Sequence, residues 1–110
     1  MVKYEPDPLG RAFAALADPT RRAMIAQLYE SESASVSEIA KRHPISLPAV
    51  MKHLDVLAGA GLILRTKTGR TVTCRPNPEP MEEARRWLDQ YQRFWTRSLD
   101  RLAQLVEDDQ

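Results

Sequence analysis

The chain has 110 residues and a net charge of +1, with 43% hydrophobic and 28% charged residues. This length and balance suit one soluble globular domain and leave no room for a second. Because Cys74 is the only cysteine, an internal disulfide and a metal site built from several thiolates are excluded, and a reducing compartment is the simplest setting. The chain has no signal core and no run of about 18 apolar residues, so we expect a cytoplasmic protein without a membrane partner.

The small net charge conceals a basic middle segment between acidic ends. Residues 41–75 contain seven Lys and Arg residues and one acid, Asp55, so this segment alone carries +6. Such an asymmetry is typical of a surface that binds a polyanion, although charge alone is equally consistent with a solvated basic face. The order of the predicted elements is needed to choose between these interpretations.

The N-terminal third predicts two helices after a loose arm over residues 1–8. The Ala-rich stretch 9–17 has the pattern of a short helix. A second helix is predicted to begin at Asp18-Pro19, because Asp is a favourable N-cap and Pro suits the first helical position. We expect the second helix to end in the polar run 29–33.

A short helix, a turn and a longer helix are predicted next. Val36 is a candidate for a minimal strand, and Ser37 is the expected N-cap of a helix over residues 38–42. The sequence 43–45 interrupts this helix, since a residue that precedes proline disfavours the helical region. Ser46 is the next expected N-cap.

The longer helix is predicted over about 47–60, with Gly61 as its stop signal. One side of this helix is apolar and is expected to anchor it to the core. The residues of that side are Leu47, Val50, Leu54 and Leu57.

A β-hairpin is predicted after this helix, with strands over 62–66 and 71–75 and a turn over 67–70. Prolines at positions 76, 78 and 80 predict a stiff connector, and the pattern is helical again from 81 to about 106. The predicted fold class is therefore mainly α with a small β-hairpin wing, a winged helix-turn-helix in the order α-α-α-α-β-β-α, as a single domain over residues 1–110.

This order of elements favours DNA as the polyanion. In a winged helix-turn-helix, the second helix of the motif reads the major groove and the basic hairpin touches the flanking backbone or the minor groove. Small residues at the start of the reading helix allow a close approach, and Lys52 can reach a phosphate or a guanine edge. The predicted DNA-binding residues are Ser46, Leu47, Pro48, Ala49, Met51, Lys52, His53, Arg65, Lys67, Thr68 and Arg70.

An apolar stripe with three- and four-residue steps follows the predicted last helix and includes both tryptophans of the chain. This helix either covers the core of its own domain or packs on a partner subunit, and a cofactor-binding role for the aromatic residues is a weaker alternative. On its charged side, Asp89 and Arg93 are four residues apart and predict a surface ion pair.

The chain resembles the ArsR-type bacterial regulators in three blocks that occur in the right order and spacing. Residues 16–22, Leu-Ala-Asp-Pro-Thr-Arg-Arg, are similar to the entry to their second helix. Residues 46–57 and 59–63 are similar to their recognition helix and its exit into the wing. The resemblance covers roughly residues 9–105 and implies a dimeric transcriptional repressor that leaves its operator when a signal arrives.

Because the resemblance implies a dimer, we expect the apolar stripe to pack against a partner subunit and the first helix to contribute to the same interface. The predicted interface residues are Phe13, Leu16, Trp87, Leu88, Tyr91, Trp95, Leu99 and Leu102. A two-fold dimer calls for a near-palindromic operator. We therefore expect a sequence-specific, homodimeric DNA-binding repressor, whose effector is an unidentified small molecule, a partner protein or its own concentration.

The resemblance also bears on metal sensing. Many ArsR-type regulators bind metal through a Cys-x-Cys pair before the recognition helix, and the matching stretch 36–42 has no cysteine. Others use Asp and His ligands in the last helix, which has no histidine here. The chain is therefore more similar to the metal-independent, autorepressor-like branch, and we expect no metal and no cofactor.

Two other functions were weighed against DNA binding. An enzyme is disfavoured because the candidate catalytic groups, Cys74, His43 and His53, fall in three different elements and predict no nucleophile–base pair. A winged-helix protein-interaction module without DNA binding remains the alternative, although it has no need for a segment of +6. A redox switch at an exposed Cys74 is left open.

Overall fold

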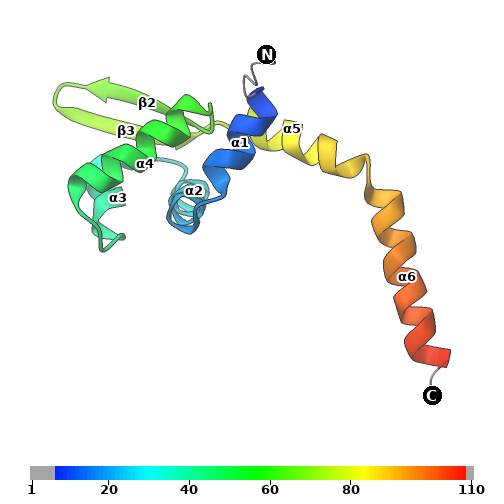
Figure 1. Cartoon of the computed structure of the whole chain (residues 1–110). Helices are drawn as coiled ribbons and strands as arrows, with labels where there is room; N and C mark the ends of the chain where they lie inside the picture. Colours follow the sequence, from blue (N-terminus) through cyan, green and yellow to red (C-terminus); the bar gives the residue numbers. More distant parts are fainter. Residues whose placement is uncertain (1–6, 109–110) are drawn as a thin grey trace, which may run out of the picture.

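The computed structural model describes residues 7–108 and contains a helical body with a projecting hairpin and a projecting C-terminal helix (Figure 1). The predicted fold class is confirmed: the molecule is mainly α with a small antiparallel sheet. The elements are α1 (Pro8–Leu16), α2 (Pro19–Ser31), β1 (Ala34–Ser35), α3 (Val36–Lys41), α4 (Leu47–Gly59), β2 (Ile63–Thr68), β3 (Thr71–Pro76), α5 (Pro78–Asp89) and α6 (Gln92–Asp108).

Helices α1, α2 and α4 each begin at a side-chain cap and have proline at the first or second helical position. The side chain of Asp18 accepts a hydrogen bond from the backbone N–H of Arg21, and Ser46 caps α4 in the same way. Asp7 caps α1, so that Pro8, expected in the loose arm, is the first residue of the helix. The rest of the predicted arm, residues 1–6, lies outside the described residues.

The start of α3 differs from the prediction. Ser35, not Ser37, is the N-cap, and it forms a reciprocal capping box with Glu38. The predicted strand residue Val36 is therefore the first residue of α3, and the strand β1 lies just before it. Because β1 pairs with β3, the sheet has three strands in the order β1-β3-β2.

The wing is the antiparallel pair β2–β3, which turns at Gly69 with a φ of +62°. Ile63 at the base of β2 is buried, and every later residue of this strand is exposed. The hairpin is therefore held by the core at its base and stands in solvent along the rest of its length.

The core lies between the four helices α1 to α4 and the base of the sheet, and α4 contributes Val50, Leu54 and Leu57 to it. Leu47 does not share this role: its side chain is 57% exposed, because it occupies the first turn of α4 beyond the edge of the core. Cys74 is fully buried, so the exposed thiol that a redox switch requires is absent, and burial raises the pKa of this thiol.

The predicted single helix over 81–106 is wrong in two respects. It begins earlier, at Pro78, because Asn77 caps it and the first turn of a helix needs no proline N–H. It is also broken after Asp89, and the chain resumes as α6 at Gln92. The predicted pair of Asp89 with Arg93 spans this break.

Asp89 pairs instead with Arg85, within α5, at 2.5 Å. The same Arg85 also forms an ion pair with Glu82, one turn earlier. These charged side chains of α5 therefore form ion pairs with one another at three- and four-residue spacing, as is usual on a solvated helix face.

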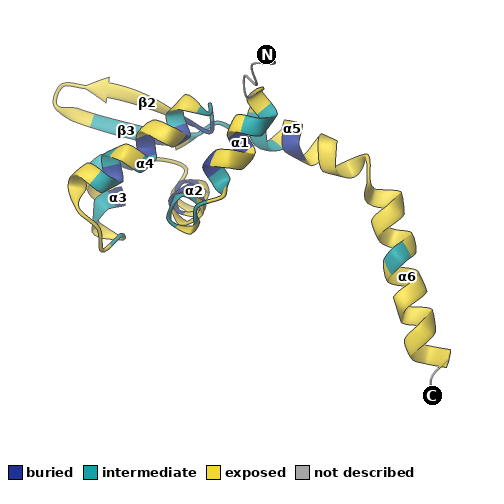
Figure 2. Ribbon diagram, in the orientation of Figure 1, coloured by how far each residue is buried: buried dark blue, intermediate teal, exposed yellow. Residues whose placement is uncertain are grey.

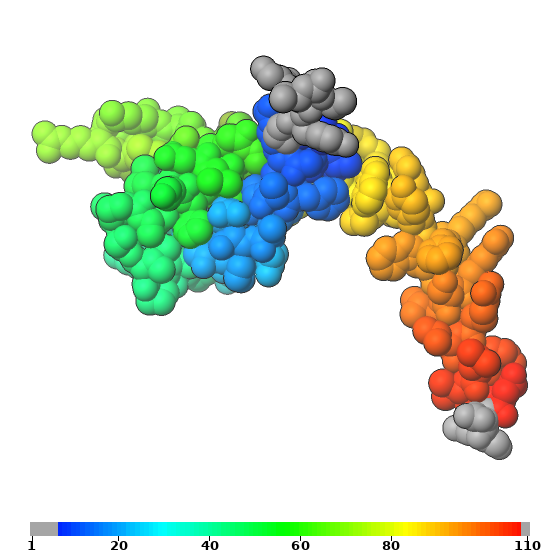
Figure 3. Space-filling model, in the orientation of Figure 1, coloured from blue at the N-terminus to red at the C-terminus, as the bar shows by residue number. Residues whose placement is uncertain are grey.

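The helix α6 extends away from the body and buries none of its residues (Figure 2). Phe94 and Trp95 are 71% and 58% exposed. The radius of gyration is 18.7 Å, whereas a compact domain of this length has about 13 Å. Figure 3 shows this extension as an arm at one end of the molecule, with the wing at the other.

Candidate nucleic-acid interface

The helix-turn-helix consists of α3, the turn 42–46 and α4, and the turn is attached to the body through His43. The imidazole Nε2 of His43 lies 3.2 Å from the side-chain oxygen of Gln27, which is buried on α2. The amide nitrogen of Gln27 in turn donates to the carbonyl of Glu38. This chain of contacts fixes the turn and thereby the direction in which α4 begins.

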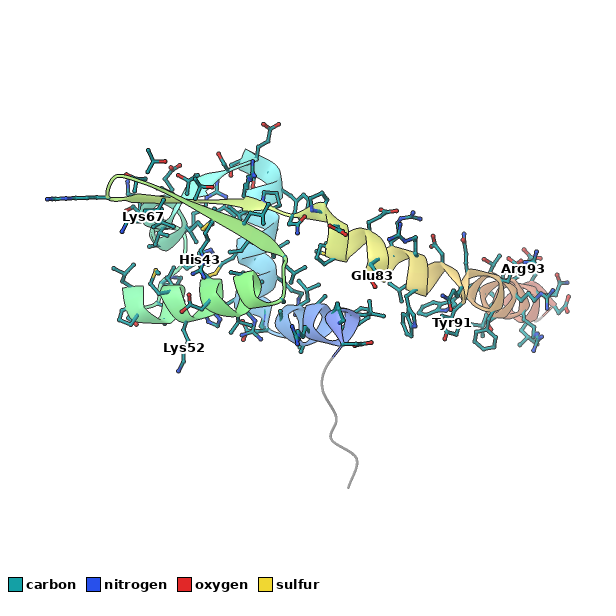
Figure 4. All side chains as sticks on the ribbon, turned by 90° about the horizontal axis from the view of Figure 1, so that it is seen from above. His43, Lys52, Lys67, Glu83, Tyr91 and Arg93 are labelled. Atoms are coloured by element: carbon teal, nitrogen blue, oxygen red, sulfur yellow. The ribbon has the colours of Figure 1, made fainter. Side chains whose placement is uncertain are left out.

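The N-terminal half of α4 presents its predicted contact residues to solvent. Ser46 Oγ accepts from the backbone N–H of Ala49 at 3.3 Å, and Leu47 and Pro48 are exposed. Figure 4 shows Lys52 extending from α4 away from the rest of the protein. Its amine forms no ion pair with another residue of 7–108 and is free to meet an anion.

His53 was predicted on the same open side, but it lies differently. Its Nδ1 is 3.4 Å from Nη1 of Arg21 and 4.0 Å from a carboxylate oxygen of Asp18. The side chain is 23% exposed, so only part of the ring is accessible. His53 therefore touches the scaffold through one edge of its ring.

The wing divides into a free tip and a braced base. Lys67, Thr68 and Arg70 at the tip are exposed, and no ion pair with another described residue occupies the two cations. Arg65, nearer the base, donates to the carboxylate of Asp55 on α4 at 2.6 Å. Among the predicted wing contacts, Arg65 is thus engaged within the protein, whereas the tip is available.

A cleft of about 370 Å³ joins the start of α4 to the wing. Leu47 and Met51 line it from α4, and Arg70 lines it from the wing. Ser37 and Thr71 also line it, although they were absent from the predicted set. Ser37 lies on α3 and Thr71 lies beyond the wing tip, so neither belongs to the reading helix or the tip residues 67–70 on which the prediction rests.

The predicted interface residues of the first and last helices fall into two groups. Phe13 and Trp87 contact each other edge to face at a centroid distance of 5.8 Å, and Trp87 meets Tyr91 in the same way at 5.2 Å. Leu16 packs against the core of its own protomer. Phe13, Trp87, Leu88 and Tyr91 are between 38% and 44% exposed, whereas Trp95, Leu99 and Leu102 are each more than half exposed.

The soft metal donors do not converge. In residues 7–108, no three His, Cys, Asp or Glu side chains lie close enough together to hold a metal ion. His43 contacts Gln27, His53 faces Arg21, and Cys74 is buried within the sheet. No helix in this same part of the chain is both long and apolar enough to span a membrane.

Comparisons with known proteins agree with this geometry. A family model described as a helix-turn-helix domain matches residues 16–66. The chain is 40% identical to the HTH-type transcriptional regulator Rv2034 of Mycobacterium tuberculosis, over 90% of this chain and 89% of that protein. It is 26% identical to the transcriptional repressor SdpR of Bacillus subtilis, over 73% of this chain and 88% of that protein.

A solved structure extends the similarity to the fold. The crystal structure of an ArsR family transcriptional regulator, RHA00566, matches with a TM-score of 0.75 and 42% identity, over 87% of this chain and 97% of that one. Sequence, fold and the arrangement of α3, α4 and the wing therefore lead to one conclusion: this chain belongs to the ArsR family of winged helix-turn-helix transcriptional regulators.

Proposed function

We propose that the protein is a sequence-specific DNA-binding repressor that acts as a homodimer. The observation that carries this proposal is the cleft shared by α4 and the wing, which Arg70 lines, together with the exposed Lys52 on α4 and Lys67 at the wing tip. The start of α4 would lie in the major groove, and the wing would follow the flanking backbone or enter the minor groove. The contacts of the wing would supply affinity, and those of α4 would select the sequence.

The proposed dimer is supported by the apolar face of α6, which no other part of residues 7–108 covers. Trp95, Leu99 and Leu102 are each more than half exposed, and a contiguous face of this size marks an interaction surface in a soluble protein. A second copy is the occupant that we propose, because the aromatic contacts of Phe13, Trp87 and Tyr91 connect α1 to the start of this face. The interface would therefore be continuous over α1, α5 and α6.

A two-fold dimer sets the form of the operator. Two reading helices related by a two-fold axis meet successive major grooves about 34 Å apart, so the operator would be near-palindromic. Repression rather than activation is proposed from the relative SdpR, which is itself named a transcriptional repressor.

The test is a fluorescence-anisotropy titration with duplex DNA from the region upstream of the gene. Lys52→Ala and Arg70→Ala should each weaken binding, and the affinity of the wild type should fall steeply with salt because bound cations release counterions from DNA. Arg86→Ala, which removes the same charge from α5, is the matched control and should bind like the wild type.

The two variants should also differ from each other. Lys52→Ala should reduce discrimination between operator and scrambled DNA, whereas Arg70→Ala should weaken both about equally. Binding of both variants at wild-type strength would refute the assignment of this surface. Absence of salt-sensitive DNA binding by the wild type would favour the alternative, a winged-helix module that binds protein.

A further inference from the structure

The side chain of Arg21 connects three helices. Its Nε donates to the carbonyl of Ala15 at 2.6 Å, and Nη2 donates to the carbonyl of Ala14 at 3.3 Å. Both carbonyls belong to the C-terminal turn of α1, and that of Ala14 also accepts from the backbone N–H of Ala17 at 3.2 Å. The remaining nitrogen, Nη1, lies 3.4 Å from Nδ1 of His53 on α4.

The chemistry of this last contact determines where the imidazole proton is. A guanidinium has only donors, so Nδ1 of His53 must supply a lone pair to Arg21. A neutral imidazole carries one N–H, which then belongs to Nε2. A hydrogen bond to Asp18 would instead need the proton on Nδ1. The nearest carboxylate oxygen of Asp18 is 4.0 Å from Nδ1, which is too far for a hydrogen bond. This oxygen already accepts from the backbone N–H of Arg21 at 3.0 Å.

The other edge of the ring is open for a ligand. No residue of 7–108 forms a hydrogen bond with Nε2 of His53, and this residue directly follows Lys52 on α4. The oxygens of a DNA phosphate are acceptors only, so they bind an N–H and are repelled by a bare nitrogen lone pair. The protonation of Nε2 therefore decides whether His53 can contribute to DNA binding.

We propose that Arg21 is a positioning residue of the reading helix, which holds His53 with its proton on Nε2 so that the ring donates a hydrogen bond to a DNA phosphate. This inference rests on the proposed DNA-binding function. It gives Arg21, which is not among the predicted contact residues, a role in binding that it exerts through His53.

The first experiment needs no DNA. Two-bond ¹H–¹⁵N correlation spectra of the ¹⁵N-labelled protein distinguish the two neutral forms of histidine, and the chain has only two histidines. At about pH 8.5, His53 should show the Nε2–H pattern. Loss of one set of signals in His43→Gln assigns the other set to His53.

Variants of two neighbouring arginines separate this role from capping of α1. Arg22 also closes this helix end, because it donates to the carbonyl of Leu16 at 2.7 Å, but within residues 7–108 it forms no hydrogen bond or ion pair with α4. Arg21→Met should shift His53 toward the Nδ1–H form that faces Asp18, whereas Arg22→Met should leave the pattern unchanged. A wild-type proton on Nδ1, or no change in Arg21→Met, would overturn the proposal. The wild-type spectrum decides this even if Arg21→Met fails to fold.

The second experiment measures operator affinity in a double-mutant cycle. Arg21→Met and His53→Ala should each weaken binding by roughly three- to tenfold, the effect of one hydrogen bond. Together they should weaken it no more than His53→Ala alone, and Arg22→Met should bind like the wild type. Additive losses would overturn the proposal. A wild type that does not bind DNA would instead refute the proposed function and leave the proton assignment standing.

Discussion

The guanidinium of Arg65 in the wing lies 2.6 Å from the carboxylate of Asp55 in α4, so the two parts of the proposed DNA-binding surface are joined by an ion pair. Asp55 is also the only acid within the basic segment 41–75. Its side chain is exposed, so the pair is accessible to solvent and to salt.

This pair predicts opposite effects on stability and on DNA binding. Because exposed pairs contribute at most about 1 kcal/mol, Asp55→Asn should hardly change the free energy of unfolding. The same variant removes a negative charge and releases Arg65, so affinity for DNA at low salt should rise roughly threefold. Arg65→Gln should lower the affinity. Denaturant unfolding and anisotropy check the two effects, and weaker binding by Asp55→Asn would contradict the prediction.

The exposed face of α6 predicts the oligomeric state. Trp95→Asp places a charge in the proposed interface and should yield a monomer, with the helical content of the body retained because Trp95 is not part of the protomer core. Gln104→Asp adds the same charge to the polar side of α6 and should remain a dimer. Sedimentation equilibrium at micromolar concentration measures both. A wild-type monomer under these conditions would remove the basis of the proposal.

His43 predicts a loss of stability in mild acid. Burial lowers the pKa of His43 below its ordinary value of 6.5, and the charges of Arg42 and His53 act in the same direction. The unfolded chain therefore binds a proton that the folded chain resists, and stability declines as pH falls from about 6.5 through the folded pKa. His43→Gln keeps a donor for Gln27 and should flatten the dependence of denaturant midpoints between about pH 5 and pH 7.5. An equally steep dependence in this variant would show that another group is responsible.

The buried thiol predicts resistance to oxidation. Burial raises the pKa of Cys74, so the reactive thiolate is disfavoured and peroxide should leave operator binding unchanged. The unfolded chain should react rapidly and is the positive control. Since the folded thiol keeps its proton longer than the unfolded one, stability should decline as pH rises above the ordinary value of 9.0. Rapid modification of the native protein would contradict the burial of this side chain.

Metal independence remains a prediction. A tight site needs three or four ligands at about 2.0–2.3 Å from the ion, and the described residues provide no such group. Stoichiometric zinc, cadmium, copper or arsenite should therefore leave a gel shift unchanged relative to a chelated sample. Release of DNA by one of these that persists in Cys74→Ser would reveal a site formed in another way, for example between subunits.

The parts of the fold that were predicted from the sequence depend on local signals. Asp18-Pro19 and Ser46 mark helix starts by their own chemistry, and Gly69 marks the wing turn. The start of α3 was misplaced although a signal was present: Ser35 and Glu38 have the spacing of a capping box, whereas Ser37 does not. The break after Asp89 has no such signal, because neither glycine nor proline occurs there.

The parts of the site that could not be predicted depend on distant partners. Lys52 and the wing tip were recognised from helix periodicity and turn chemistry, which are properties of the local sequence. The engagement of His53 depends on Arg21, 32 residues earlier, and that of Arg65 depends on Asp55, which only the folded hairpin brings near. A single sequence gives the type of each side chain, but the partner with which that side chain forms an ion pair or hydrogen bond is determined by the tertiary structure.

In the proposed dimer, the isolation of α6 from the body would link the abundance of the protein to its folding. The 17-residue helix α6 buries none of its residues against its own protomer, whereas most of the stability of a helix in a protein comes from tertiary packing of its amphipathic face. In the proposed dimer, α6 would therefore gain its order from the partner, and subunit association and helix formation would be a single step. The melting temperature would then rise with protein concentration. When the cellular concentration of the protein is low, the number of chains synthesised would thus determine how many form a dimer that can bind DNA.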